Sequence, residues 1–175
     1  MEGPALIADA LGRVNSILHR ALSGVPAETL CKMPSPDSNS MAWLAWHLTR
    51  VQDDHLSSLA GLPQLWISDG WHAKFGMPAD EKETGTGHTL EQAAAFKVDS
   101  AAPLLAYNDA VYERSKAYLA RLNPEDLDAV INEPQYDPPP TVGVRLVSVV
   151  SDNNQHAGQV AYLRGYFEGY GWRRI

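Results

Sequence analysis

The sequence has little of what marks several large classes of protein. A single cysteine, Cys31, excludes an internal disulfide and any site built from several thiolates. No apolar run reaches the ~20 residues that cross a bilayer, and the first residues mix apolar with polar side chains, unlike a signal peptide. A net charge of −7 disfavours a general nucleic-acid or anionic-membrane surface. We therefore expect a cytoplasmic protein with no membrane or nucleic-acid partner.

What is present is helical sequence sufficient for one domain, residues 1–175. The prolines gather in three segments and leave four long stretches whose apolar residues recur every three or four positions, as on amphipathic helices. A capping-box sequence begins a further short helix at Thr89. No segment shows the alternation of a strand, so the sequence predicts an all-α four-helix bundle. The predicted long helices cover about residues 4–22, 40–60, 99–122 and 141–168.

The connection after the second long helix, from Gly61 to His88, is longer than most loops. It carries large apolar side chains that a solvated linker would not have: Trp66, Trp71, Phe75 and Met77. This segment either folds over the bundle as a packed cover or forms the wall of a pocket. The sequence favours neither interpretation over the other.

Two polar side chains interrupt the apolar face of the last predicted helix. Each helical residue advances by about 100 degrees, so Asp152 and His156 project one turn apart into the same arc as Val149 and Val160. The spacing i, i+4 lets two ligands reach one metal ion. A simple hydrogen-bonded pair of aspartate and histidine has the same spacing, and the pattern alone is compatible with both.

The second predicted helix carries histidines that could complete a metal site. His47 stands at the inner edge of its apolar stripe and His55 nearer the centre. They lie two turns apart, roughly 12 Å along the axis, and cannot both bind one ion. Either one, joined with Asp152 and His156, would give two histidines and one carboxylate. Such a set leaves coordination positions open for water or substrate.

Two segments make the sequence similar to a known family. SMAWLAWHLTRVQDDHL and SDNNQHAGQVAYLRG resemble the second and fourth helices of the DinB/YfiT-like superfamily, which includes mycothiol-dependent maleylpyruvate isomerase. The resemblance spans most of the chain and implies a four-helix bundle, often dimeric, that holds one divalent metal, zinc or nickel. It implies that His47, Asp152 and His156 are the ligands and leaves His55 as a core or pocket histidine. Most members have a histidine where Asp152 stands, and the isomerase branch has a carboxylate there.

The resemblance also implies a function. The metal would lower the pKa of an external low-molecular-weight thiol of the mycothiol or bacillithiol type, and the thiolate would attack a small electrophilic substrate. The activity would be that of a thiol S-transferase or isomerase, although an open zinc site could equally activate water for hydrolysis. The alternative is a non-catalytic bundle that acts as a binding or stress-related protein, with a degenerate or empty metal site.

Four further residues are candidates for substrate contacts: Arg145, Asn108, His55 and Gln159. Arg145 shares the face of Asp152 and could hold a substrate carboxylate, or it could pair with an acid at the end of the bundle. Asn108 interrupts the apolar stripe of the third long helix, where it could line a pocket or bond to its neighbours.

Small residues gather on the back of the last predicted helix: Gly158, Ala161 and Gly165. Glycine within a helix costs around 1 kcal/mol relative to alanine, so two on one face indicate close approach of another backbone. Because the front of this helix already faces the bundle, we expect that backbone to belong to the second subunit of a homodimer.

Overall fold

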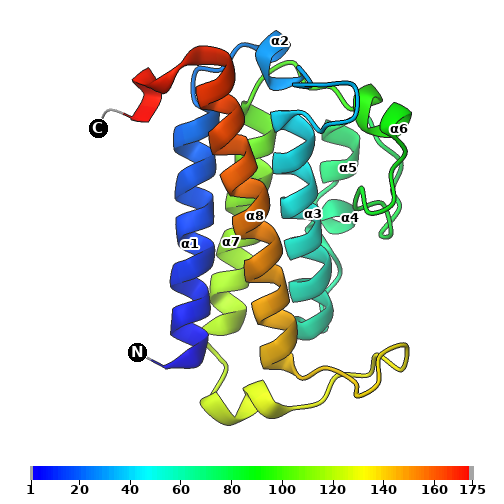
Figure 1. Ribbon diagram of the computed structural model, residues 1–175. Coiled ribbons are helices and arrows are strands. Elements are labelled where there is room, and N and C mark those ends of the chain that lie inside the picture. The colour runs from blue at the N-terminus through cyan, green and yellow to red at the C-terminus, as the bar shows by residue number, and fades with distance from the viewer. Residues whose placement is uncertain (1, 174–175) are drawn as a thin grey trace.

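Four long helices lie side by side in the computed structural model, which describes residues 2–173 (Figure 1). α1 and α3 each pack against both α7 and α8, so the helices surround one core in the order α1, α8, α3, α7. The described residues contain no β-strand, only one isolated bridge between Val130 and Thr141. The all-α bundle predicted from the sequence is confirmed. The bounds of the long helices are α1 Gly3–Leu22, α3 Met41–Ala60, α7 Ala102–Leu119 and α8 Val142–Glu168.

The helix ends follow local chemistry. The Ser40 side chain accepts a hydrogen bond from the backbone N–H of Trp43 at the start of α3, and Thr141 does the same for Val144 at the start of α8. Gly61 ends α3 with a φ of 65°, a left-handed conformation that glycine adopts without strain. These caps fix where the two helices that carry the candidate ligands begin.

The direction of the helices explains the length of the connection after α3. In Figure 1, α1 and α8 run in one direction, and α3 and α7 run in the other. Because α3 and α7 are parallel neighbours, the chain must return along the whole of α3, about 30 Å, before α7 can begin. The connection runs along the side of the bundle next to α3, far from α1.

This connection is a packed structure with short helices of its own. Trp66 is completely buried and Trp71 nearly so, and both rings contact that of Tyr107 on α7. The segment is therefore a cover on the bundle. The short elements of the whole chain are α2 Ala27–Leu30, α4 Leu65–Ser68, α5 Trp71–Lys74, α6 Leu90–Ala95, η1 Pro124–Asp128 and η2 Tyr170–Arg173.

The core runs the length of the bundle as two groups of buried apolar side chains. The larger group joins α1, α3, α7 and α8 to the aromatic residues of the connection, with Trp46 and Trp66 among its fully buried members. The smaller group lies toward the end of the bundle where α8 begins, around Leu11 and Leu146. No helix in the described part of the chain is both long enough and apolar enough to cross a membrane.

Candidate metal centre

Three side chains from two neighbouring helices converge at one place in the bundle. His47 comes from α3, and Asp152 and His156 come from successive turns of α8. One potential ligand atom from each lies within 4.8 Å of the others. His47 is buried, whereas 20% of the His156 side chain and 32% of that of Asp152 are exposed. The group is therefore anchored in the bundle but open to a small molecule from outside.

The imidazole of His47 is oriented by a backbone carbonyl. Its Nδ1 atom lies 2.5 Å from the oxygen of Thr84, in the connection after α3. A carbonyl oxygen only accepts hydrogen bonds, so Nδ1 carries the proton and donates it. The Nε2 atom then has a free lone pair, which is the form in which a histidine binds a metal. The ring also stacks on Trp43, with 4.7 Å between the centroids.

The imidazole of His156 is oriented in the same way, but by a side chain. Its Nδ1 atom lies 2.8 Å from Oε1 of Gln159 and donates to it, and its Nε2 atom faces Oδ1 of Asp152 at 3.4 Å. The rings of His47 and His156 are nearly perpendicular, with centroids 4.9 Å apart. Both histidines therefore have a hydrogen-bonded Nδ1, which leaves Nε2 as the nitrogen that can bind a metal.

The carboxylate of Asp152 has an oxygen without a hydrogen-bond partner. Its Oδ2 atom is buried and accepts no hydrogen bond from the described residues. A buried polar atom left unpaired is destabilising, and a bound cation is a partner that would satisfy it. Two imidazole nitrogens and one carboxylate oxygen form a donor set that suits zinc and other divalent transition metals. The residues present thus fit such an ion.

The two histidines differ in their affinity for protons. Burial lowers the pKa of His47 below its usual 6.5, and this outweighs the opposing effect of the bond to Thr84. The hydrogen bond that the His156 ring donates to Asp152 raises the pKa of His156 above the same value, although burial partly opposes it. A proton therefore competes with a metal more strongly at His156 than at His47.

A cavity of about 420 Å³ opens beside the cluster. This volume lies within the range of small-molecule sites. One side comes from the bundle and the loop before α3, and the other from the connection, which thus walls a pocket as well as covering the core. None of the described residues that line it is lysine or arginine. They are Asp37, Asn39, Trp43, His47, Asp152, residues 85–90 and Ala93.

The wall of the cavity is fixed by a histidine. His88 bonds through Nε2 to Oε1 of Glu83 at 2.8 Å, and its Nδ1 accepts the indole N–H of Trp43 at 3.2 Å. Because the indole donates to Nδ1, the proton of the neutral ring is on Nε2 and points to the carboxylate. His88 thus ties the segment between Glu83 and Thr89 to the start of α3.

Of the four residues predicted as substrate contacts, Gln159 lies at the cluster, where it binds His156. Asn108 is buried, with its amide between Thr49 and Asn15, so its polar atoms are already used within the bundle.

The other two lie outside the cluster, His55 on α3 and Arg145 in the first turn of α8. Arg145 forms an ion pair with Glu133 and does not line the cavity, so substrate binding would require that pair to open. His55 has its Nδ1 atom 3.9 Å from the carboxylate of Asp54 and takes no part in the cluster. Burial lowers its pKa.

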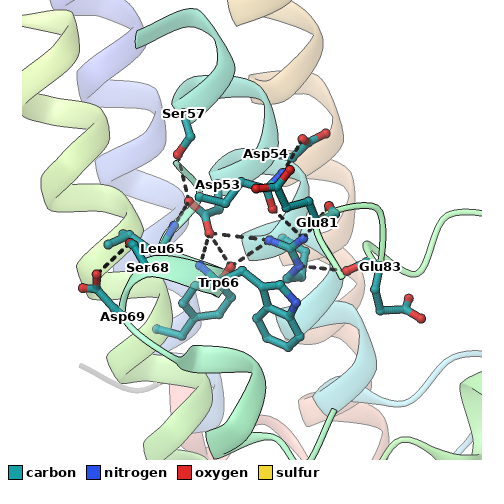
Figure 2. A network of polar contacts seen from close by, with 12 residues as sticks. Asp53, Asp54, Ser57, Leu65, Trp66, Ser68, Asp69, Glu81 and Glu83 are labelled. Atoms are coloured by element: carbon teal, nitrogen blue, oxygen red, sulfur yellow. Dashed lines mark hydrogen bonds and ion pairs between the residues drawn. The ribbon is translucent and has the colours of Figure 1, made fainter. Parts of the chain in front are cut away.

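The interpretation of the sequence missed a buried polar network between α3 and the connection that follows it (Figure 2). It is centred on Arg50 and Asp53, which are both buried and lie three residues apart on α3. Opposite charges at i, i+3 were the available signal, but such pairs are common on exposed helix faces. Only the fold of the connection shows that they are covered.

Comparisons with known proteins agree with this architecture. The family model described as the DinB superfamily matches residues 10–160. The crystal structure of a conserved protein from Enterococcus faecalis is similar to this one, with 32% sequence identity and a TM-score of 0.88 over 97% of this chain and 99% of that chain. No curated protein matches the sequence.

Proposed function

The chain belongs to the DinB superfamily, and from that membership and the geometry of His47, Asp152 and His156 we propose that it is a metal-dependent S-transferase. Its co-substrate would be a low-molecular-weight thiol of the mycothiol or bacillithiol type, and its metal zinc or nickel. The observation that carries the proposal is the convergence of two histidines, each with its Nδ1 atom hydrogen-bonded elsewhere, on a carboxylate with an unpaired buried oxygen.

The three side chains would have different roles in holding the metal. When bound, a divalent cation supplies a Lewis acid that lowers the pKa of an incoming thiol. His47 and His156 offer neutral nitrogens whose direction is fixed by Thr84 and Gln159, and Asp152 brings one negative charge. Three protein groups of the described residues converge, and two of them, His47 and Asp152, also line the cavity, where the thiol and its partner can meet.

The lining of the cavity favours an uncharged electrophile. Its described residues include the carboxylates of Asp37 and Asp152 and no cationic side chain that could pair with a substrate carboxylate. The indole of Trp43 and the side chain of Leu90 supply apolar surface. A small neutral molecule with a leaving group on carbon fits this chemistry better than a dicarboxylate does.

The test is thiol conjugation by the zinc-loaded protein with monochlorobimane as electrophile and bacillithiol, mycothiol or glutathione as thiol. In the reaction a C–S bond forms, the C–Cl bond breaks, chloride leaves and the thiol proton passes to solvent. We expect one of the thiols to react faster than without protein, and His156→Ala or a chelator to abolish the difference. A fully metal-loaded protein that accelerates none of these reactions contradicts the proposal. If the protein instead hydrolyses esters or amides, it is a metal-dependent hydrolase. If it shows neither activity, it is a non-catalytic bundle.

We also propose that the protein is a homodimer formed through the outward face of α8. Along this face the exposed side chains are uncharged, and Tyr162 and Tyr166 are exposed by 70% and 60% with their rings stacked. A Cβ placed on Gly158 would meet no atom within 4 Å, so this point of the face is open to a partner backbone. Exposed apolar and aromatic side chains gathered in this way are typical of protein interfaces.

A further inference from the structure

Arg50 is completely buried and lies about one turn from His47 on α3. Its guanidinium reaches across to the connection and donates to two backbone carbonyls there, that of Glu83 at 2.9 Å and that of Glu81 at 3.0 Å (Figure 2). The same group lies over the ring of Trp66, at 4.6 Å from its centroid. A buried cation thus holds the segment 81–83 against the bundle.

The position of the guanidinium is itself fixed by other side chains. It donates to Oε1 of Gln64 at 2.8 Å and to the hydroxyl of Tyr107 at 3.1 Å, and its Nη1 atom lies 3.5 Å from Oδ2 of Asp53. Together with the bonds to the two carbonyls, these contacts use all the N–H groups of the guanidinium.

Asp53 in turn cannot move freely. Its carboxylate accepts hydrogen bonds from the backbone N–H groups of Leu65 and Trp66 and from the hydroxyls of Ser57 and Tyr107 (Figure 2). The carboxylate of Asp53, which compensates the charge of Arg50, is therefore hydrogen-bonded to residues of α3, α4 and α7. Arg50 is the point at which this rigid network meets the segment 81–83.

The carbonyl that follows this segment is the one that orients His47. Arg50 holds the oxygen of Glu83, and the next carbonyl along the chain, that of Thr84, accepts the Nδ1 proton of His47. Gly85 comes next, with a φ of 85°, and a Cβ there would lie 2.8 Å from Trp46 and 2.9 Å from Trp43. The backbone at Thr84 therefore lies between a fixed hydrogen bond and a tight aromatic contact.

We infer that Arg50 is a positioning residue for the metal centre. By holding the carbonyls of Glu81 and Glu83 it places the Thr84 oxygen at His47, which keeps the proton on Nδ1 and turns Nε2 toward Asp152 and His156. The importance of this for metal binding rests on the proposed function, but the tautomer of His47 exists without metal and can be measured separately.

The first variant to test is Arg50→Lys, which retains the charge but lacks the planar fork that binds both carbonyls. Long-range ¹H–¹⁵N NMR of the metal-free protein at pH 8 reports which ring nitrogen of His47 is protonated. Competition with a chelating dye gives the zinc affinity. We expect the wild type to hold the proton on Nδ1, and the variant to show a mixture of tautomers and a zinc affinity lower by about 10-fold or more.

The matched control is Arg114→Lys. Arg114 also donates to a carbonyl of the same connection, that of Pro63, but at the end remote in sequence from Thr84. A loss of general anchoring would affect both variants. We expect this control to leave the tautomer of His47 and the zinc affinity unchanged.

A second pair of variants does not disturb the buried charge and serves if Arg50→Lys fails to fold by circular dichroism. Gly85→Ala puts a methyl group against Trp43, Trp46 and His47, which should move the Thr84 carbonyl away from His47. Gly87→Ala has a similar positive φ, 81°, but its Cβ would meet nothing within 4 Å. We expect only Gly85→Ala to change the tautomer and weaken zinc binding.

The outcomes separate the two proposals. If folded Arg50→Lys and Gly85→Ala proteins keep the wild-type tautomer of His47, the inference is wrong, whatever their zinc affinity. If the wild type binds no zinc or nickel, the proposed function is wrong, and the tautomers still decide the role of Arg50.

Discussion

At the residue scale, the candidate site depends on which nitrogen of each histidine is left free. His47 gives its Nδ1 proton to a backbone carbonyl and His156 gives its own to Gln159. Partners of this kind orient metal-binding imidazoles and raise their basicity. Asp152 differs, because one of its oxygens is buried with no hydrogen-bond partner. A cation bound between the three groups would give that oxygen a partner.

Replacing Asp152 by Asn tests its part in this arrangement. The hydrogen bond that His156 donates to Asp152 raises the pKa of His156, so in the metal-free protein it adds stability below the unfolded pKa of about 6.5. That stability is lost as the pH rises through the higher folded value. We expect Asp152→Asn to lower the pKa of His156 in an NMR titration, to remove this pH dependence in urea unfolding, and to weaken zinc binding at least 10-fold.

A matched control for this variant is Asp54→Asn, since Asp54 lies beside His55 and outside the cluster. It should leave the pKa of His156 and the zinc affinity as in the wild type. An unchanged pKa of His156 in Asp152→Asn would mean that the two side chains do not interact in solution, and unchanged zinc binding would mean that Asp152 is no ligand.

The sequence predicted part of this site and could not predict the rest. The spacing of Asp152 and His156 follows from helical periodicity, and the family resemblance distinguished His47 from His55. The structure brings that set of three together. The Thr84 carbonyl belongs to the backbone, which carries no residue-type signal, and its place beside His47 depends on how the whole connection folds.

At the element scale, α3 organises both the core and the site. One of its sides buries Leu44 and Leu48, while His47 faces α8, and Arg50 and Asp53 face the connection. The long helices were predictable because a period of 3.6 residues over many residues is a strong signal. The four-residue helices α4 and α5 were not, since elements of that length depend on contacts from elsewhere. Asp53 accepts hydrogen bonds from the first N–H groups of α4.

Asp53→Asn should therefore destabilise the connection and the bundle together. The change removes the negative charge that faces Arg50 and leaves a buried cation uncompensated. The loss of one partner of such a pair costs about 3–5 kcal/mol in the free energy of unfolding, measurable in urea. The neighbouring change Asp54→Asn, at a side chain 38% exposed, should cost far less. Equal effects of the two variants would mean that the network contributes little.

At the scale of the whole molecule, the parallel arrangement of α3 and α7 creates the cavity. The chain must return along α3 to begin α7, and the returning segment supplies the wall that faces His47. The sequence showed that this connection is long and aromatic but left open whether it is a cover or a wall. It is both, because its tryptophans pack on the core while residues 85–90 line the cavity.

The proposed dimer predicts a measurable oligomeric state. Tyr162→Glu places a charge on the uncharged outward face of α8, and we expect it to convert a micromolar dimer into a monomer in sedimentation velocity. The control is Ala106→Glu, an exposed position on α7 and so on a different helix of the bundle. A wild type that sediments as a monomer at micromolar concentration would overturn the dimer and leave the metal centre untouched.

The most direct test of the proposed metal centre is the metal content of the untagged protein, measured by inductively coupled plasma mass spectrometry. His47→Ala and His156→Ala remove proposed ligands, and His55→Ala removes a histidine of α3 outside the cluster. We expect close to one zinc or nickel per chain in the wild type and in His55→Ala, and loss of the metal in His47→Ala and His156→Ala. No stoichiometric metal in the wild type, even after incubation with zinc and nickel salts, would contradict it and leave Asp152 and His156 as a polar pair in a non-catalytic bundle.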